Sequence, residues 1–198
     1  MSIHTRFNSL EKIDEAFIAA FVLERLGFPV QPVKPKPHTK RLNHVLRTIE
    51  GIEHTWSLSL THRSKAFGQK VRGETIQLWS VNRKTAGVLE YLVAATKARR
   101  ILEIGTSAGY STLFLANGAK QNRGKVLTVE ALPEKVLLAK KHFKLSGLNN
   151  ITLLEGNALK ILKTWNGGSV DFVFLDADKE NYGKYLHYLL PMMKVGAM

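Results

Sequence analysis

Hydrophobic and polar residues follow two different periods along the second half of the chain. From Lys84 onward, apolar residues recur at helical spacing between positions 88 and 95, in "STLFLANGA", and again from Pro133 to Ser146. Short apolar runs separate these segments: "RILEIG", "KVLTVE", "ITLLEG" and, after the helical "ALKILKTW", "VDFVFLDA". Strands that alternate with helices need crossover connections. The pattern therefore predicts an α/β fold with a mostly parallel sheet and helices on both faces.

The first eighty residues have a weaker pattern. Apolar positions between Asn8 and Gly27 predict an amphipathic helix that Asn8 caps and Gly27 ends. Four prolines between positions 29 and 37 exclude helix and the interior of a sheet. We therefore divide the chain into an N-terminal helix at 1–28, a proline-rich linker at 29–37, a basic helical region at 38–80 and a main domain at 81–198.

Composition narrows the class of protein. The 198 residues include no cysteine, which excludes disulfides and thiolate metal sites and fits a reducing, cytoplasmic compartment. The longest apolar run, "AFIAAFVLERLGF", is interrupted by charges and too short to span a bilayer, so we expect no membrane association. Fourteen Lys or Arg and only four Glu lie between Pro29 and Arg100. This basic half suits RNA, an acidic lipid surface or a polyanionic substrate, but we favour a solvated surface because no RNA-binding motif accompanies it.

Polar residues gather where the predicted strands end, which is where open α/β sheets bind ligands. The first strand runs into "EIGTSAGYS", which contains Glu103, Gly105, Gly109 and Ser111. Gly105 allows a tight turn and close approach of a ligand to the backbone, and Gly109 opens the next helix. An ordinary strand-turn-helix junction has the same pattern. The spacing does not match the dinucleotide pattern G-x-G-x-x-G, which argues against an NAD enzyme.

The later strand ends contribute further candidates. Glu130 ends the second strand about 20 residues beyond the glycines, where a carboxylate accepts hydrogen bonds from ribose hydroxyls. An exposed loop acid is the alternative. Asn157 and Ala158 follow the third strand, where they would either border an adenine ring or form a turn and a helix cap. Three charged residues follow the fourth strand: Asp176, Asp178 and Lys179.

Together, the segments "LEIGTSAGYSTLFLA", "VLTVE", "GNAL" and "FLDADKENY" resemble class I S-adenosylmethionine-dependent O-methyltransferases in order and spacing. Within that class they are most similar to the cation-dependent group that includes catechol and caffeoyl-CoA methyltransferases. The resemblance covers roughly Val81 to Met198. It implies a Rossmann-like methyltransferase fold with an N-terminal helical extension. It also implies methyl transfer from S-adenosylmethionine to a hydroxyl of a small, catechol-like acceptor.

The resemblance also implies roles for single residues. The cofactor-binding residues would be Val81, Glu103, Gly105, Thr106, Gly109, Ser111, Glu130, Asn157, Ala158 and Asp176. Of these, Ser111 would hydrogen-bond the methionine carboxylate and Glu130 would hold the ribose. Asp176 matches the first ligand of Mg²⁺ or a similar cation. The catalytic residues would be Lys179, which matches the general base, and Asp178 beside it; a lysine near a cation loses its proton more readily. A solvated lysine at a helix start is the alternative.

The chain departs from the family pattern at its end. After "PMMKVGA" the family continues into a second metal pair, an Asp followed by an Asn, and into two further strands. Asp176 is then the one metal ligand present, and a single carboxylate does not hold Mg²⁺ against its own hydration. We therefore expect a fragment of a longer protein whose last strands are missing. A degenerate form that keeps the cofactor site is the other interpretation.

Two further functions stay open. The acceptor would be RNA if the basic half served binding, because relatives of this family methylate a hydroxylated uridine in tRNA, and affinity would then fall steeply with salt. Alternatively, the chain is a non-catalytic cofactor-binding or interaction module. The expected partners are a small-molecule acceptor, RNA in the alternative case, and a second copy of the full-length protein in a homodimer.

Overall fold

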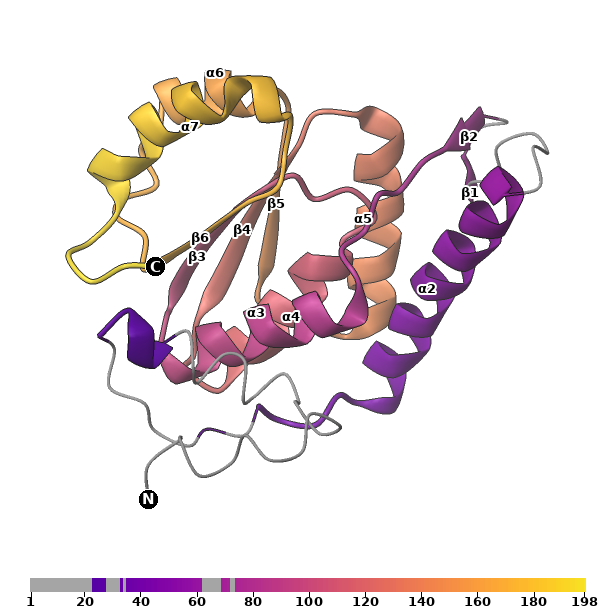
Figure 1. Cartoon of the computed structure of the whole chain (residues 1–198), viewed down its shortest axis with the longest axis horizontal. Helices are drawn as coiled ribbons and strands as arrows, with labels where there is room; N and C mark the ends of the chain where they lie inside the picture. Colours follow the sequence, from indigo (N-terminus) through magenta and orange to yellow (C-terminus); the bar gives the residue numbers. More distant parts are fainter. Residues whose placement is uncertain (1–22, 28–32, 34, 62–68, 72–73) are drawn as a thin grey trace.

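The computed structural model describes residues 23–27, 33, 35–61, 69–71 and 74–198 (Figure 1). Most of the helix predicted at 1–28 and half of the proline-rich linker lie outside the described residues. Within them, Gly27 has a φ of 76° and donates its N–H to the carbonyl of Glu24 at 3.1 Å. This geometry is typical of a helix end and agrees with the end expected at Gly27.

A parallel sheet forms the centre of the fold. Its strands are β3 (Arg100–Ile104), β4 (Lys125–Glu130), β5 (Ile151–Glu155) and β6 (Phe172–Leu175), in the order β5-β4-β3-β6. Every pairing in this sheet is parallel. The chain moves outward from β3 to β5 and then crosses back to place β6 beside β3. The strand order thus reverses between β3 and β6, which is where such sheets bind ligands. The predicted α/β fold class is confirmed.

Helices cover both faces of the sheet (Figure 1). They are α2 (Lys40–Thr61), α3 (Arg83–Ala95), α4 (Tyr110–Lys120), α5 (Pro133–Ser146), α6 (Ala158–Lys163) and α7 (Tyr182–Leu189), with the short 3-10 turns η3 (Lys179–Asn181) and η4 (Leu190–Met192). Alternate residues of β3 point to opposite faces: Ile101 packs among residues of α3 and α4, whereas Leu102 and Ile104 pack among those of α6 and α7. Among the described residues, no helix is both long and apolar enough to cross a membrane.

The region expected to be helical before the main domain also contains a β-hairpin. α2 accounts for the predicted helix, but β1 (Gln69–Val71) and β2 (Glu74–Ile76) follow it and pair antiparallel. The description of 38–80 as a helical region was therefore wrong for its last part. Each strand has three residues, which is too short to show the alternation that identifies a strand in a sequence.

The last residues of the chain run beside the outer edge of β6. Val170 and Met193 form an isolated parallel bridge. Further along, the N–H of Val173 donates to the carbonyl of Met198 at 2.8 Å, and the N–H of Met198 donates to the carbonyl of Asp171 at 3.1 Å. Residues 193–198 thus satisfy part of the edge of β6 that β3 does not cover.

Candidate functional site

A cavity of about 490 Å³ opens at the carboxyl edge of the sheet. It is lined by 105–107 after β3, 130–132 after β4, 156–158 after β5 and 176–178 after β6, together with 78–81 ahead of α3. These segments lie far apart in the sequence. They meet because parallel strands all end at the same edge of a sheet. Most of the predicted cofactor-binding residues therefore share one cavity.

A tight turn after β3 forms the floor of this cavity. Gly105 has a φ of 103°, and a Cβ added there would lie 2.0 Å from the carbonyl oxygen of Asp176. The N–H groups of Gly105 and Thr106 both donate to the carbonyl of Val129, at 3.0 and 3.2 Å. Only glycine fits a position with this backbone conformation and this close a neighbour. The tight turn expected at Gly105 is present.

Gly109 serves packing and does not line the cavity. Its φ is 87°, and a Cβ there would lie 2.5 Å from the ring of Phe143 on α5. The position is the N-cap of α4, and no side chain caps it. The second glycine of the motif thus allows the start of α4 to lie against the ring of Phe143, and the structure does not support its direct contact with a cofactor.

Glu130 presents a carboxylate with a fixed orientation. One carboxylate oxygen accepts the N–H of Ser107 at 2.8 Å, and the other accepts those of Ala131 and Leu132, each at 2.9 Å. The residue is buried at the cavity wall. A carboxylate has about four acceptor positions, so these three donors fix its direction and leave capacity for a ligand hydroxyl. This geometry suits binding of a diol such as a ribose.

Glu103 lies beneath the cavity and does not line it. Its carboxylate is fully buried and accepts the hydroxyls of Ser111 and Thr128, each at 2.6 Å, and that of Thr112. Thr106 hydrogen-bonds Thr128 at 2.6 Å and extends this network to the turn. Burial raises the pKa of Glu103 to about 7, although the three hydroxyls act in the opposite direction.

This network corrects two predictions. Side chains alternate between the two faces of β3, so Glu103 points to the same face as Ile101. That face is covered by α4 and lies opposite α6 and α7. Glu103 therefore supports the site from below. Ser111 lines the cavity, but its proton is donated to Glu103 and is not available to the methionine carboxylate.

The segment 78–81, which we call the strap, lines the cavity ahead of α3. The hydroxyl of Ser107 donates to the carbonyl of Leu78, and the N–H of Ser80 donates to a carboxylate oxygen of Glu53 at 2.9 Å. Val81 lines the cavity, as the resemblance implied. The Ser80 hydroxyl oxygen is buried and has no hydrogen-bond partner among the described residues. An unsatisfied hydroxyl beside a cavity is suited to a ligand polar group.

Lys135 and Trp79 are among the side chains of this site that were not predicted from the sequence. Lys135 on α5 is 7% exposed and lines the cavity, and its Nζ lies 4.9 Å from the ring centroid of Trp79 on the strap. Burial lowers the pKa of Lys135, against the opposing effect of Glu130 and Glu53. A lysine in the first turn of a helix opposes the helix dipole. That unfavourable position was the one sequence signal that pointed to Lys135, whereas Trp79 gave none.

The residues after β6 divide between cavity and surface. Asp176 and Asp178 line the cavity. Asp178 accepts the hydroxyl of Tyr185 at 2.5 Å and the side-chain amide of Asn181, and these hydrogen bonds lower its pKa. Lys179 is exposed and lies outside the cavity lining. The three charged residues of "DADK" therefore do not converge on one point.

A divalent cation does not fit the side chains that the structure describes at this site. Asp176 would be its ligand, but in the described part of the chain no three or more His, Asp or Glu side chains form a group that could hold a metal ion. Mg²⁺ requires several oxygen ligands in near-octahedral geometry. We therefore derive no chemical step through a metal.

Asn157 has both of the roles considered for it. Its side chain caps α6 by accepting the N–H of Lys160 at 3.2 Å, and Asn157 and Ala158 also line the cavity. The side-chain oxygen of Asn157 therefore caps α6. The position of Asn157 in the cavity lining also allows contact with a ligand.

Comparisons with known proteins agree with this arrangement. A family described as O-methyltransferase matches residues 63–198, and the match thus begins ahead of Val81. The catechol O-methyltransferase of Mycobacterium tuberculosis is 40% identical over 108 residues, which cover 54% of this chain and 49% of that protein. The caffeoyl-CoA O-methyltransferase of Medicago sativa is 35% identical over 116 residues, covering 56% of this chain and 47% of that protein. The chain thus spans about half the length of these curated relatives.

A solved structure extends the comparison to three dimensions. The crystal structure of an O-methyltransferase from Bacillus cereus in complex with SAH superposes with a TM-score of 0.60 and 25% identity, covering 89% of this chain and 68% of that one. The resemblance to the catechol and caffeoyl-CoA group is confirmed. Because the family match extends over more than half of the sequence and its strand-end segments line one cavity, the chain belongs to the O-methyltransferase family.

Proposed function

We propose that the protein binds S-adenosylmethionine and transfers its methyl group to a hydroxyl of a small, catechol-like acceptor. The observation that carries this proposal is the Glu130 carboxylate, which three backbone N–H groups hold at the wall of the 490 Å³ cavity. Two similar proteins are named for catechol and caffeoyl-CoA methylation, and the Bacillus cereus enzyme was solved with SAH. A cavity of this size suits a nucleoside-containing ligand.

The cofactor would lie across the strand ends. Glu130 would accept hydrogen bonds from its ribose hydroxyls, and Asn157 and Ala158 would border its adenine. The turn at Gly105 and Thr106 would face the methionine part. Ser111 would accept a hydrogen bond from the methionine ammonium group, because its own proton is donated to Glu103.

Methyl transfer requires little covalent chemistry from the protein itself. The acceptor oxygen attacks the methyl carbon, the carbon–sulfur bond breaks with its electron pair left on sulfur, and the hydroxyl proton passes to a base. The protein has to align the two reactants and favour loss of that proton. Asp178 is a weak base because its hydrogen bonds lower its pKa. The side chain of Lys179 is exposed, so its assignment as the base rests on the family resemblance alone.

Cofactor binding gives the direct test. In titration calorimetry with S-adenosylmethionine, Glu130→Ala should lose the hydrogen bonds from the ribose hydroxyls to a charged carboxylate. At about 1.5–3 kcal/mol for such bonds, the affinity should fall about 10- to 100-fold. Glu155→Ala is the matched control, because Glu155 is the register partner of Glu130 on β5 and lies outside the cavity lining.

The outcomes separate the parts of the proposal. Unchanged affinity of Glu130→Ala would overturn the ribose assignment, and a parent protein that binds neither S-adenosylmethionine nor SAH would overturn the proposed function. Because Glu130 also holds three N–H groups, thermal unfolding of each variant has to accompany the titration. Transfer of a labelled methyl group to catechol or caffeoyl-CoA then tests the acceptor class.

A further inference from the structure

A second cavity, separate from the cofactor cavity, lies between α6 and α7. Its volume is about 380 Å³, and it is lined by Leu159, Lys160, Lys163, Gly183, Lys184, His187 and Tyr188. We call it the α6–α7 groove. The helices α6 and α7 pack against each other along the groove. No acidic side chain belongs to its lining. The groove is therefore a basic depression on the surface.

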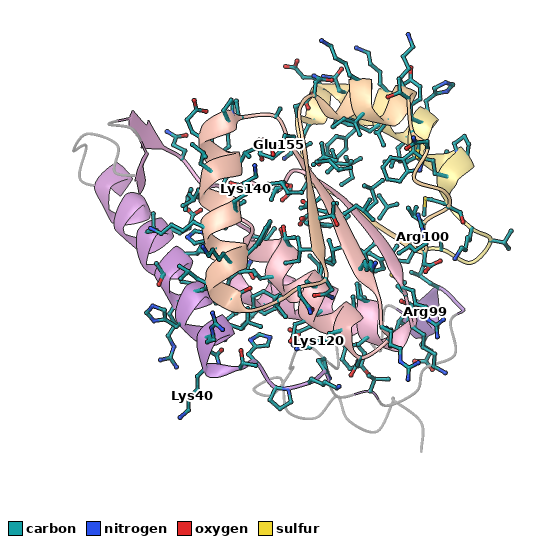
Figure 2. The ribbon with its side chains drawn as sticks, turned by 180° about the vertical axis from the view of Figure 1, so that it is seen from behind. Lys40, Arg99, Arg100, Lys120, Lys140 and Glu155 are labelled. Carbon is teal, nitrogen blue, oxygen red and sulfur yellow. The ribbon has the colours of Figure 1, made fainter. Side chains whose placement is uncertain are left out.

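The lysines of the groove are not held in ion pairs within the described chain, although the charge of Lys184 interacts with that of Asp178. Lys160, Lys163 and Lys184 are all exposed, and none takes part in an ion pair among the described residues. Lys184 donates to the side-chain oxygen of Asn181 at 2.9 Å, which is a neutral partner. Elsewhere on the surface, Lys140 pairs with Glu155 (Figure 2). Several cations without an ion-pair partner around one depression favour an anionic ligand.

Aromatic side chains accompany these lysines. The rings of His187 and Tyr188 lie 5.2 Å apart in an edge-to-face arrangement, and Tyr188 is half-buried against the apolar core. Leu159 completes the apolar part of the lining. Lysines that contact phosphates, next to aromatic rings on which bases stack, are the combination that binds single-stranded nucleic acids. We propose that the α6–α7 groove binds single-stranded RNA.

The position of the groove relates it to the cofactor cavity. α6 starts at Ala158, which together with Asn157 lines the cofactor cavity, and α7 starts shortly after Asp178, which lines it too. Figure 1 shows the two helices side by side on one face of the sheet. An RNA strand in the groove would lead toward the cofactor cavity. Methyl transfer to such a strand would rest on the proposed cofactor binding and would require an RNA acceptor in place of the small, catechol-like one, whereas RNA binding itself depends on neither.

The basic character of the whole chain supplies a matched control. Figure 2 shows nitrogen-tipped side chains that project from α6 and α7 into solvent, and it places Lys120 toward the opposite end of the molecule. Lys97, Lys120 and Lys125 are also exposed, and they lie at the ends of α3 and α4 and the start of β4. Replacing these three lysines removes the same charge from the other edge of the sheet.

Fluorescence anisotropy with a labelled single-stranded oligouridylate tests the proposal on the full chain, without S-adenosylmethionine. The variant Lys160→Gln/Lys163→Gln/Lys184→Gln should bind at least about tenfold more weakly at moderate salt. The slope of log affinity against log salt should shrink by about 2, because each lost phosphate contact contributes about 0.7 for a single strand. The control Lys97→Gln/Lys120→Gln/Lys125→Gln should stay within about twofold of the parent.

Substitutions of Tyr188 distinguish the contribution of base stacking to RNA binding from that of charge. Tyr188→Leu should weaken RNA binding at least about fivefold at unchanged salt slope, and Tyr188→Phe should retain it, because stacking of one base contributes about 1–3 kcal/mol by substitution. Equal losses in both lysine variants would mean diffuse attraction and overturn the proposal, as would a parent that does not bind the oligonucleotide. Preference for anionic vesicles over RNA would also overturn it and would assign the surface, with the exposed Leu186 and Leu190, to membranes. None of these outcomes depends on the calorimetric test of Glu130.

Discussion

The buried carboxylate of Glu103 links the stability of this fold to pH. Its pKa is raised from an ordinary value of 4.5 to about 7, mainly by burial. Between these values the folded protein holds a proton that the unfolded chain has lost. The stabilisation is therefore fully present below pH 4.5 and is lost as pH rises to about 7. At about 1.4 kcal/mol per pKa unit, the whole effect is about 3.5 kcal/mol in the free energy of unfolding.

The substitution Glu103→Gln isolates this effect. Glutamine does not ionise and keeps one side-chain oxygen, which can accept either the hydroxyl of Ser111 or those of Thr112 and Thr128, because these donate to different oxygens of the Glu103 carboxylate. Relative to the parent, the free energy of unfolding of the variant should rise by up to about 3 kcal/mol between pH 5 and pH 8. His142 acts in the opposite direction, because burial lowers its pKa below 6.5 and the resulting stability is lost as pH falls. Both chains contain His142, so its contribution cancels in the difference.

Urea unfolding at a series of pH values measures this difference. Glu155→Gln is the control, because it removes an exposed carboxylate from the end of β5, which is separated from β3 by β4. Its difference from the parent should stay flat over the same range. A flat difference for Glu103→Gln as well would refute the reasoning, since it would mean that the three hydroxyls compensate for the loss of hydration.

Two substitutions test the turn and the base. Gly105→Ala should destabilise the protein by about 3 kcal/mol or more and abolish S-adenosylmethionine binding, because the new Cβ would overlap the carbonyl of Asp176. Gly51→Ala, in a helix with nothing within 4 Å of the added Cβ, should cost no stability, and a similar loss at both positions in thermal unfolding would count against the steric argument. Lys179→Met should lower kcat and change its pH profile while S-adenosylmethionine affinity stays constant; Lys144→Met is the control, and an unchanged profile would assign the base elsewhere.

The regular part of the fold could be predicted because its hydrophobic periods are long and its ends are marked. The helix from Pro133 to Ser146 was predicted to the residue, since Pro133 suits a first turn and Gly147 takes the left-handed conformation beyond the end. The hairpin at 69–76 was missed because three-residue strands leave no periodic signal. Pattern length, more than composition, decided which elements were found.

The site was predicted to the level of strand ends and no further. Parallel strands end at one edge, so the segments that contain Gly105, Glu130 and Asp176 were expected to meet. Whether a side chain faces the cavity or the helices depends on register within the strand, and Glu103 was misplaced for that reason. The contact between Trp79 and Lys135 joins two segments with no shared pattern, and only the packed structure brings them together.

Backbone contacts set the spacing of the cofactor side of this site. Ile104 pairs with Leu175, and the N–H of Asp176 continues the ladder to the carbonyl of Ile104 at 2.9 Å. The carbonyl of Asp176 then occupies the space that a side chain at Gly105 would need, while the turn donates to Val129 on the other side. Glu130 follows Val129 directly, so the two carboxylates flank one turn that main-chain hydrogen bonds hold from both sides. Substitutions of the exposed side chains after β6 should therefore leave this turn in place, because main-chain atoms make its contacts.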